Sequence, residues 1–200
     1  MGLSYNKFSS TIFPTTQPVD TIFINRPDNI AGGFMVLLNT SVSASLTKWW
    51  YTNTTLRLSR VGLKGKVLTA DVDFKSNIAR LEVNNYFTLG KSLSAELGGY
   101  YASRDFTGQT VTSGMYRINA SIQHKFWEGK ASIRLSFEDI FHSWVYHNRS
   151  ISLIQSEYFQ TTTTDTQRIG AAFTYRFGKD TFTRKRRHNN NASDEDKERL

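Results

Sequence analysis

Four histidines are the residues that could hold a metal ion in this chain, which has 200 residues and no cysteine. A pair of histidines four residues apart beside a carboxylate is a typical zinc-binding pattern. The nearest pair here is five residues apart in an expected loop, so we predict no metal site and no cofactor. The four are His124, His142, His147 and His188.

Glu138 and Asp139 are adjacent carboxylates that could work together as a general acid and base. Neighbouring residues of a strand point to opposite faces, so this pair cannot form such a dyad within a strand. We expect Asp139 to interrupt the strand instead. No set of Ser, His and Asp residues can be brought together from the sequence, and we predict that the chain is not an enzyme.

Basic residues give the chain a formal net charge of +8, which could attract nucleic acid or anionic lipid. Four of them form one run, 184–187, and four acidic residues follow closely between 194 and 198. Mixed charge blocks of this kind are typical of a solvated tail. No basic surface interleaved with aromatic residues is evident, so we expect no nucleic-acid partner.

The segment 166–178, TQRIGAAFTYRFG, has a period of two residues. Its apolar side holds Ile169, Ala171, Phe173, Tyr175 and Phe177, and its other side is mostly polar. This alternation predicts a strand with one apolar and one polar face. From residue 179 to residue 200 the chain turns hydrophilic, so the sequence predicts strands over 1–178 and a charged, disordered tail over 179–200.

The same alternation recurs along the chain, and no window shows a helical period. Each predicted strand has about 9–13 residues, except for a few shorter ones. A tilted strand needs about 9–11 residues to cross a bilayer. The nine predicted strands are 2–13, 19–25, 34–46, 50–59, 79–89, 93–101, 116–126, 131–138 and 166–178.

Aromatic residues gather where the predicted strands end, as at 49–51, 100–101 and 126–127. Such clusters are typical of the girdles that flank the lipid-facing band of a membrane barrel. No run of about 18 apolar residues predicts a transmembrane helix. The sequence therefore predicts an all-β fold, an antiparallel transmembrane β-barrel meander of about nine long strands.

Short turns and long loops alternate along the predicted meander, which assigns its two ends to opposite sides of the membrane. The short turns are at 14–18, 46–48, 90–91 and 127–130, and the long loops are at 26–33, 61–75 and 104–112. The first strand would then run inward, and 141–165 would form an extension and loop without another crossing. Because single-chain bacterial barrels have even strand numbers, nine strands predict a part of a larger barrel. Miscounting the first two strands by one would allow a small closed barrel.

Three motifs carry a family resemblance: ASIRLSFEDIF at 131–141, RIGAAFTYRFG at 168–178, and Asn29 before a long two-faced strand. With the charged tail, they resemble the C-terminal part of the outer-membrane β-barrel proteins common in Bacteroidetes, which are related to TonB-dependent receptors. In such proteins an Asp or Asn, a branched apolar residue and Phe interrupt the penultimate strand. The chain departs from the pattern at His142, where Asn is usual, and nothing in it matches a plug or a TonB box.

The resemblance implies the C-terminal portion of a TonB-dependent receptor-like transporter for nutrient uptake, in the bacterial outer membrane with a periplasmic tail. The implied partners are outer-membrane lipid, the outer-membrane assembly machinery, and a missing N-terminal plug and strands of the same barrel. Two alternatives stay open: an autonomous small porin or structural barrel, and a soluble ligand-binding β-barrel. The resemblance also implies that the assembly machinery recognises the last strand through Gly170, Phe173, Tyr175 and Phe177.

Overall fold

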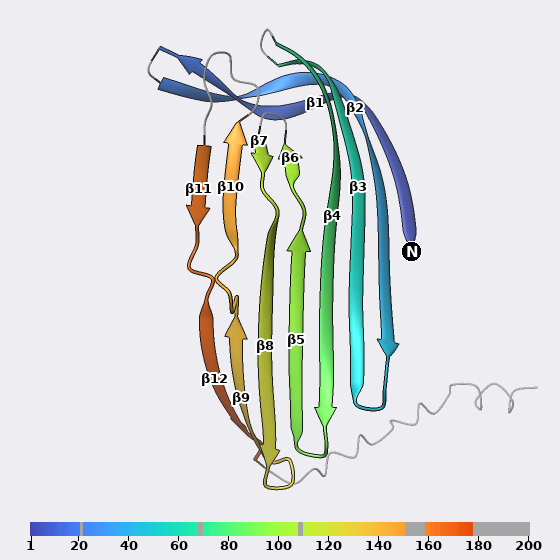
Figure 1. Cartoon of the computed structure of the whole chain (residues 1–200), viewed down its shortest axis with the longest axis vertical. Coiled ribbons are helices and arrows are strands. Elements are labelled where there is room, and N and C mark those ends of the chain that lie inside the picture. The colour runs from blue at the N-terminus through green and yellow to red at the C-terminus, as the bar shows by residue number, and fades with distance from the viewer. Residues whose placement is uncertain (21, 68–69, 108–109, 151–158, 178–200) are drawn as a thin grey trace, which may run out of the picture.

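Two antiparallel sheets make up the computed structural model, which describes residues 1–20, 22–67, 70–107, 110–150 and 159–177 (Figure 1). The larger sheet has eight strands in the order β1-β2-β3-β4-β5-β8-β9-β12. They are β1 (Gly2–Val19), β2 (Ile22–Ser45), β3 (Trp50–Val67), β4 (Ala70–Leu89), β5 (Leu93–Ala102), β8 (Met115–Phe126), β9 (Ala131–Glu138) and β12 (Arg168–Tyr175). The predicted all-β antiparallel fold is confirmed.

The smaller sheet continues the larger one upward in Figure 1 and has the order β11-β10-β7-β6. Its strands are β6 (Asp105–Thr107), β7 (Thr110–Thr112), β10 (Val145–Ser150) and β11 (Phe159–Thr163). The hairpin β6–β7 extends β5 and β8, and β10–β11 extends β9 and β12. The two sheets are separated by the non-strand residues 103–104, 113–114, 139–144 and 164–167, which we call the seam.

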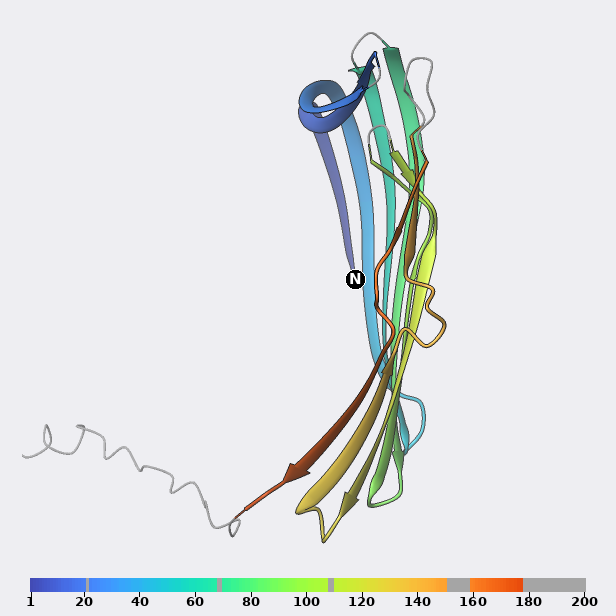
Figure 2. The ribbon, with the colours of Figure 1, turned by 90° about the vertical axis from the view of Figure 1, so that its left-hand side faces the viewer.

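Both edge strands of the larger sheet bend toward the same side (Figure 2). Within the described residues β1 is paired only with β2, and β12 is paired only with β9. The larger sheet is therefore a curved open wall and not a closed barrel.

The pairing register confirms the two faces that the alternation predicts. Glu96 lies opposite Ser121, which lies opposite Ser136, so these polar side chains share one face. Leu97, Ala120 and Phe137 form the same kind of row on the other side. We call these sides the polar face and the apolar face of the wall.

The N-terminal part of the chain differs from the prediction. The predicted turn at 14–18 and the predicted loop at 26–33 both lie within the hairpin of β1 and β2, in which Pro14 pairs with Pro27. Proline is tolerated in an edge strand because its missing N–H would not have bonded to a neighbour there. The three strands predicted before residue 46 are two, so the wall has eight strands and not nine. The first strand consequently runs in the opposite direction to the one predicted.

The remaining short turns agree with the prediction, whereas two predicted long loops do not. The short turns at residues 46–49, 90–92 and 127–130 lie together at the lower end of the wall in Figure 1. The loop predicted at 61–75 is instead largely strand, because β3 and β4 pair as far as Val67 and Ala70. The loop predicted at 104–112 likewise holds the short strands β6 and β7. The segment 141–165 holds β10 and β11, and its described residues add no further strand to the wall.

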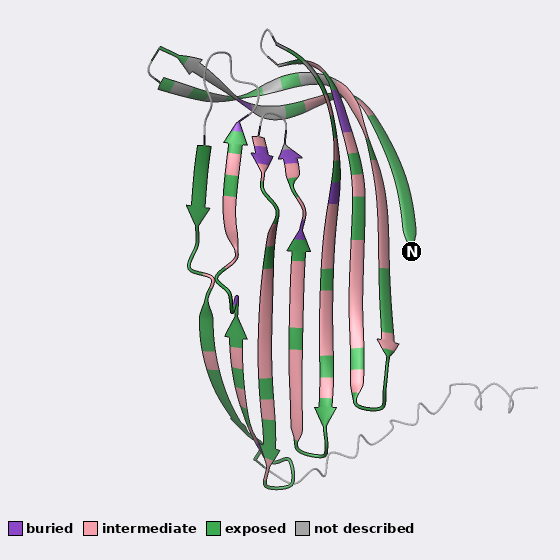
Figure 3. Cartoon of the chain, viewed as in Figure 1, coloured by how far each residue is buried: buried purple, intermediate pink, exposed green. Residues whose placement is uncertain are grey.

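Buried apolar residues are few and, apart from Ala131 at the lower end of β9, gather in the upper half of the molecule (Figure 3). The core cluster consists of Leu63, Phe106 and Val111, with Phe8 and Phe74 packed against it. Among the described residues of the wall, no second layer covers the apolar face. The small core therefore fixes the upper hairpins against β3 and β4 and does not bury the wall itself.

Candidate functional site

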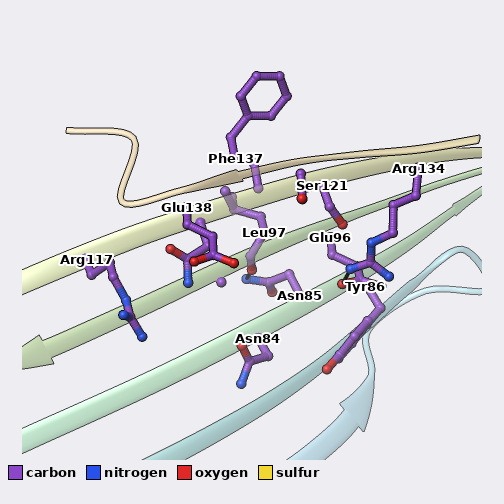
Figure 4. A pocket seen from close by; sticks show the side chains of 14 residues that line it. Asn84, Asn85, Tyr86, Glu96, Leu97, Arg117, Ser121, Arg134, Phe137 and Glu138 are labelled. Atoms are coloured by element: carbon purple, nitrogen blue, oxygen red, sulfur yellow. Dashed lines mark hydrogen bonds and ion pairs between the residues drawn. The ribbon is translucent and has the colours of Figure 1, made fainter. Parts of the chain in front are cut away.

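The polar face contains a hollow of about 330 Å³ over β4, β5, β8 and β9 (Figure 4). Asn84, Glu96, Arg117 and Arg134 contribute side chains to it, whereas Phe137 points away. The period of two on each strand puts these residues on one face, and the pairing register brings them to one level. The hollow lies at the lower end of the size range of small-molecule sites, about 300–1,000 Å³.

An ion pair crosses the hollow between Arg134 Nη2 and Glu96 Oε2, which are 2.7 Å apart. The two residues belong to strands that are not neighbours, and the small side chain of Ser121 on β8 lies between them. Both side chains are about two-fifths exposed, so the pair contributes little stability, roughly 0–1 kcal/mol. It does present charged donors and acceptors to the hollow.

Arg117 lies at the upper side of the hollow with its guanidinium over the ring of Trp144, 4.9 Å from the ring centroid. This geometry is a cation–π contact. The Nε atom of Arg117 is buried and has no hydrogen-bond partner in the described part of the chain. The side chain thus retains an unused donor.

A second hollow, of about 220 Å³, lies directly above Arg117 and is lined by both sheets. Arg80 Nη2 and Asp105 Oδ2 form an ion pair across it at 2.7 Å. Tyr100 and Trp144 meet edge to face with ring centroids 5.4 Å apart, and Trp144 meets Tyr146 in the same way at 5.8 Å. Aromatic and charged side chains therefore share this surface.

Asp139 organises the seam beside the second hollow. Its carboxylate is fully buried and accepts hydrogen bonds from the Ser143 and Trp144 backbone N–H groups, at 3.0 and 3.2 Å. The hydroxyl groups of Ser143 and Thr166 also donate to it, at 3.2 and 2.5 Å. These contacts close the chain around the carboxylate, and Asp139 does end β9, as its sequence position predicts.

Two opposing effects act on the pKa of the Asp139 carboxyl group, which lies beyond the end of β9. Burial raises this pKa, whereas the hydrogen bonds from Thr166, Ser143 and Trp144 lower it. The net pKa is below its ordinary value. The group is therefore held as a carboxylate.

The Asp139 turn is also anchored to β8. The Asp139 N–H donates to Asn119 Oδ1 at 2.9 Å, and the Ile140 N–H donates to the Ile118 carbonyl at 2.9 Å. Asp139 has a φ of 45°, a left-handed conformation that costs energy for a residue other than glycine. The buried hydrogen bonds compensate for this cost.

Aromatic residues surround the lower turns of the wall. Trp50 lies 5.8 Å from Phe87, and Tyr51 lies 5.9 Å from Tyr86, measured between ring centroids. Further along, Trp127 lies 5.9 Å from Tyr175. Trp50, Phe87 and Tyr175 lie on the apolar side of their strands, which agrees with an interfacial girdle. Tyr51 and Tyr86 instead lie on the polar face.

The four residues predicted as an assembly signal lie on or just beyond β12. Phe173 stacks near Phe126, with centroids 6.2 Å apart, and Tyr175 meets Phe177 at 4.5 Å. A Cβ atom on Gly170 would meet the Ser136 hydroxyl at 2.6 Å, so a larger residue would displace that side chain. Their recognition by an assembly machinery stays a prediction.

The histidines lie apart in the structure. His124 is on the apolar face, His142 is in the Asp139 turn, and His147 is on β10 with Nδ1 3.1 Å from the Thr161 hydroxyl. His188 and the predicted tail lie outside the described residues. Across the described ranges, no group of three or more potential metal ligands occurs.

Several residues of this surface were not identified by sequence reasoning. Trp144, Tyr146 and Asp105 fall in segments predicted as loops, and Thr166 gave no signal of its own. Their roles depend on contacts such as Thr166 to Asp139, across 27 residues of sequence. In the sequence, only the two aromatic residues within 144–146 indicated that this segment could contribute to a site.

Exposure along the wall is inverted relative to that of a water-soluble sheet. On β9 the polar residues Ser132, Arg134 and Ser136 are partly buried, whereas Ile133 and Leu135 are 45% and 40% exposed. A water-soluble protein rarely exposes an apolar surface that continues over several strands. The apolar face is therefore suited to contact with lipid.

Comparison with known proteins agrees with this geometry. Within the described residues, no helix is long and apolar enough to cross a membrane. No curated protein matches the chain, and no solved structure matches it. The family model described as the outer membrane protein beta-barrel family matches residues 1–175. The chain therefore belongs to the outer membrane protein beta-barrel family, which implies a place in a bacterial outer membrane.

Proposed function

We propose that the chain forms the C-terminal wall of a transporter barrel, with the polar face toward the lumen and the apolar face toward lipid. Family membership favours a structural or transport role over catalysis. One observation carries the proposal. On the wall, apolar side chains are exposed on one face, whereas charged side chains surround a hollow on the other face.

The transporter that we propose is of the TonB-dependent receptor kind and takes up a nutrient. Two features support this over a simple pore. The strands β1 to β4 have 18–24 residues, well above the ~9–11 that cross a bilayer, so they extend beyond it and offer a surface for capture. The Asp139 turn also supports it, since it interrupts the penultimate strand of the wall as in the receptors that the motif resembles.

In this proposal the free edges of β1 and β12 pair with further strands of the same barrel, and the lower turns and the tail lie in the periplasm. Short turns on the periplasmic side and longer loops outside are typical of outer-membrane barrels. The proposed partners are the outer-membrane lipid, the assembly machinery that inserts the strands, and the plug and strands that complete the barrel.

The count of eight strands favours a second candidate, an autonomous small barrel that acts as a porin or structural protein. Eight is an even number and is the smallest size known for such barrels. With eight strands, β1 and β12 run antiparallel and could pair directly.

Single cysteine substitutions test the orientation of the wall, because the chain has no cysteine of its own. Ser121→Cys places a thiol on the polar face, and Ile122→Cys places one on the apolar face of the same strand. We expect a charged, membrane-impermeant thiol reagent to label Ser121→Cys and not Ile122→Cys in outer membranes of the native host. A lipid-soluble reagent should label Ile122→Cys.

Lys48→Cys in a lower turn is a matched control for reagent access, because this position is exposed whatever the orientation of the wall. Equal labelling of both β8 variants by the charged reagent would contradict a lipid-facing apolar face. Recovery of the protein in the aqueous fraction would favour a soluble barrel.

A further inference from the structure

We propose that the polar face binds a carbohydrate at the aromatic cluster formed by Tyr100, Trp144 and Tyr146, which we call the aromatic platform. This proposal rests on the proposed function, since it takes the polar face as the solute-accessible lumen. The proposal adds the class of substrate, a carbohydrate, and the residues that would recognise this substrate.

The aromatic platform supplies apolar ring surface within an otherwise polar wall, and the Arg117 guanidinium lies over the Trp144 ring. Trp144 meets both tyrosines edge to face, so the three rings fix one another. All three side chains are partly exposed and line or border the upper hollow. The C–H face of a sugar ring is apolar and packs on such a surface, while its hydroxyl groups remain at the rim.

The polar side chains beside the aromatic platform are suited to hydroxyl groups. Arg80 is paired with Asp105 in the upper hollow, and Arg134 is paired with Glu96 further down the wall in the first hollow, so these four charges cancel. Each guanidinium has more N–H donors, and each carboxylate more lone pairs, than the ion pair uses. A hydroxyl group both donates and accepts, so a neutral polyhydroxylated solute can bind to both members of a pair.

Arg117 distinguishes two kinds of carbohydrate. It forms no ion pair in the described part of the chain, and its Nε atom lacks a partner. A carboxylate of an acidic sugar would pair with this uncompensated guanidinium charge, whereas a neutral sugar would meet the guanidinium with a hydroxyl group. Both are polyhydroxylated rings, and the test below separates them.

The position of the aromatic platform is set by the seam. The backbone N–H of Trp144 donates to the Asp139 carboxylate, and Ser143 donates through its hydroxyl to the Tyr116 carbonyl on β8 at 2.8 Å. Trp144 is therefore held before a ligand arrives, which lowers the entropic cost of binding. Asp139 is thus a positioning residue for the site.

Binding is measured by titration calorimetry on the purified full-length protein in detergent. The probes are neutral hexasaccharides of glucose, galactose and mannose, a hexasaccharide of galacturonate, and inorganic phosphate. We expect at least one saccharide to bind. We expect Trp144→Ala to lower the binding affinity about tenfold or more, because the ring that packs on the sugar is lost. Trp144→Phe keeps an aromatic face and should weaken it by only about threefold.

Trp49→Ala is the matched control, because it removes a half-exposed indole at the opposite end of the wall and should leave binding unchanged. If Trp144→Ala does not fold, Tyr146→Ala and Trp144→Phe still test the aromatic platform. Binding of phosphate alone, binding of no saccharide, or equal affinity of the Trp144 and Trp49 variants would each overturn the proposal. Cysteine labelling is independent of ligand, so a failed sugar site remains distinguishable from a misplaced wall.

Discussion

At the scale of single residues, Asp139 has the largest number of described contacts at the seam. One carboxylate receives four hydrogen bonds from Ser143, Trp144 and Thr166, and it joins the ends of β9 and β12. Removing it would leave several buried donors without an acceptor. The residue therefore acts on both the stability of the wall and the placement of Trp144.

We expect Asp139→Ala to lower the free energy of unfolding by about 3 kcal/mol, since hydrogen bonds to a buried charged group are lost. Asp139→Asn keeps one acceptor oxygen and should lose about half as much. Urea unfolding of the protein in lipid vesicles measures both. Equal stability of wild type and Asp139→Ala would show that the turn does not depend on the carboxylate.

Because the folded pKa of Asp139 lies below its ordinary value, the carboxylate stabilises the fold above about pH 4, and this contribution is lost as the pH falls through the folded pKa. The Asn variant cannot titrate. We therefore expect Asp139→Asn to lose less stability than wild type between pH 7 and pH 3, in the same unfolding measurement.

Sequence reasoning identified Asp139 as a break in a strand but could not identify its partners. Local alternation fixes which side a residue faces, and nothing local fixes which distant residue lies beside it. Thr166 and Asn119 reach Asp139 only through the register of β12 and β8. The same holds for Arg117 and Trp144, whose contact joins two predicted segments.

At the scale of elements, the lower turn at residues 127–130 is strained. Trp127 and Glu128 have φ values of 53° and 55°, and Gly129 follows at 86°. Side chains other than glycine rarely adopt this region, at a cost of about 1–2 kcal/mol per residue. Contacts of Trp127 with Phe126 and Tyr175 hold the turn in place.

We expect Glu128→Gly to raise the free energy of unfolding by about 1 kcal/mol, because glycine adopts this conformation without strain. Gly129→Ala is the opposite change and should lower it by a similar amount, although a Cβ there meets nothing within 4 Å. Unfolding of the three proteins in vesicles gives the comparison. A destabilised Glu128→Gly variant would mean that the Glu128 side chain contributes to the turn.

The strands of the lower wall could be predicted because each has one polar and one apolar face, which produces the period of two. That reason fails in the upper half of the molecule. There Leu63 and Phe74 lie on the polar side and pack in a small core, so the pattern no longer separates the two sides. The number of strands was predicted wrongly because the prolines of β1 indicate a turn, whereas an edge strand tolerates proline.

At the scale of the whole molecule, the two free edges decide between the larger barrel and the small one. Leu3 and Tyr5 on β1 and Ala171 on β12 all lie on the apolar side of their strands. Cα atoms in a disulfide lie at most about 7 Å apart, so a bond forms only if the two edges are neighbours.

We expect no disulfide in the double variants Leu3→Cys/Ala171→Cys and Tyr5→Cys/Ala171→Cys, because further strands separate β1 from β12 in the proposed barrel. The pair Ser41→Cys/Thr55→Cys is the positive control, since these hydroxyl groups are 3.0 Å apart on neighbouring strands. Non-reducing gels after oxidation in outer membranes give the readout. Efficient bridging of either test pair would establish the eight-stranded barrel.

The seam has a consequence for the order in which the molecule is assembled. Regular strand structure stops at the seam in four consecutive strands of the wall. Among the described residues, the Asp139 turn, the contacts of Ser103 with Ala79 and the Arg80–Asp105 ion pair join the two sheets there. The lower strands can therefore enter the bilayer and complete their pairing while the upper hairpins are still unstructured. The upper hairpins can then fold last, and their sequence can change over generations without altering the strands below the seam.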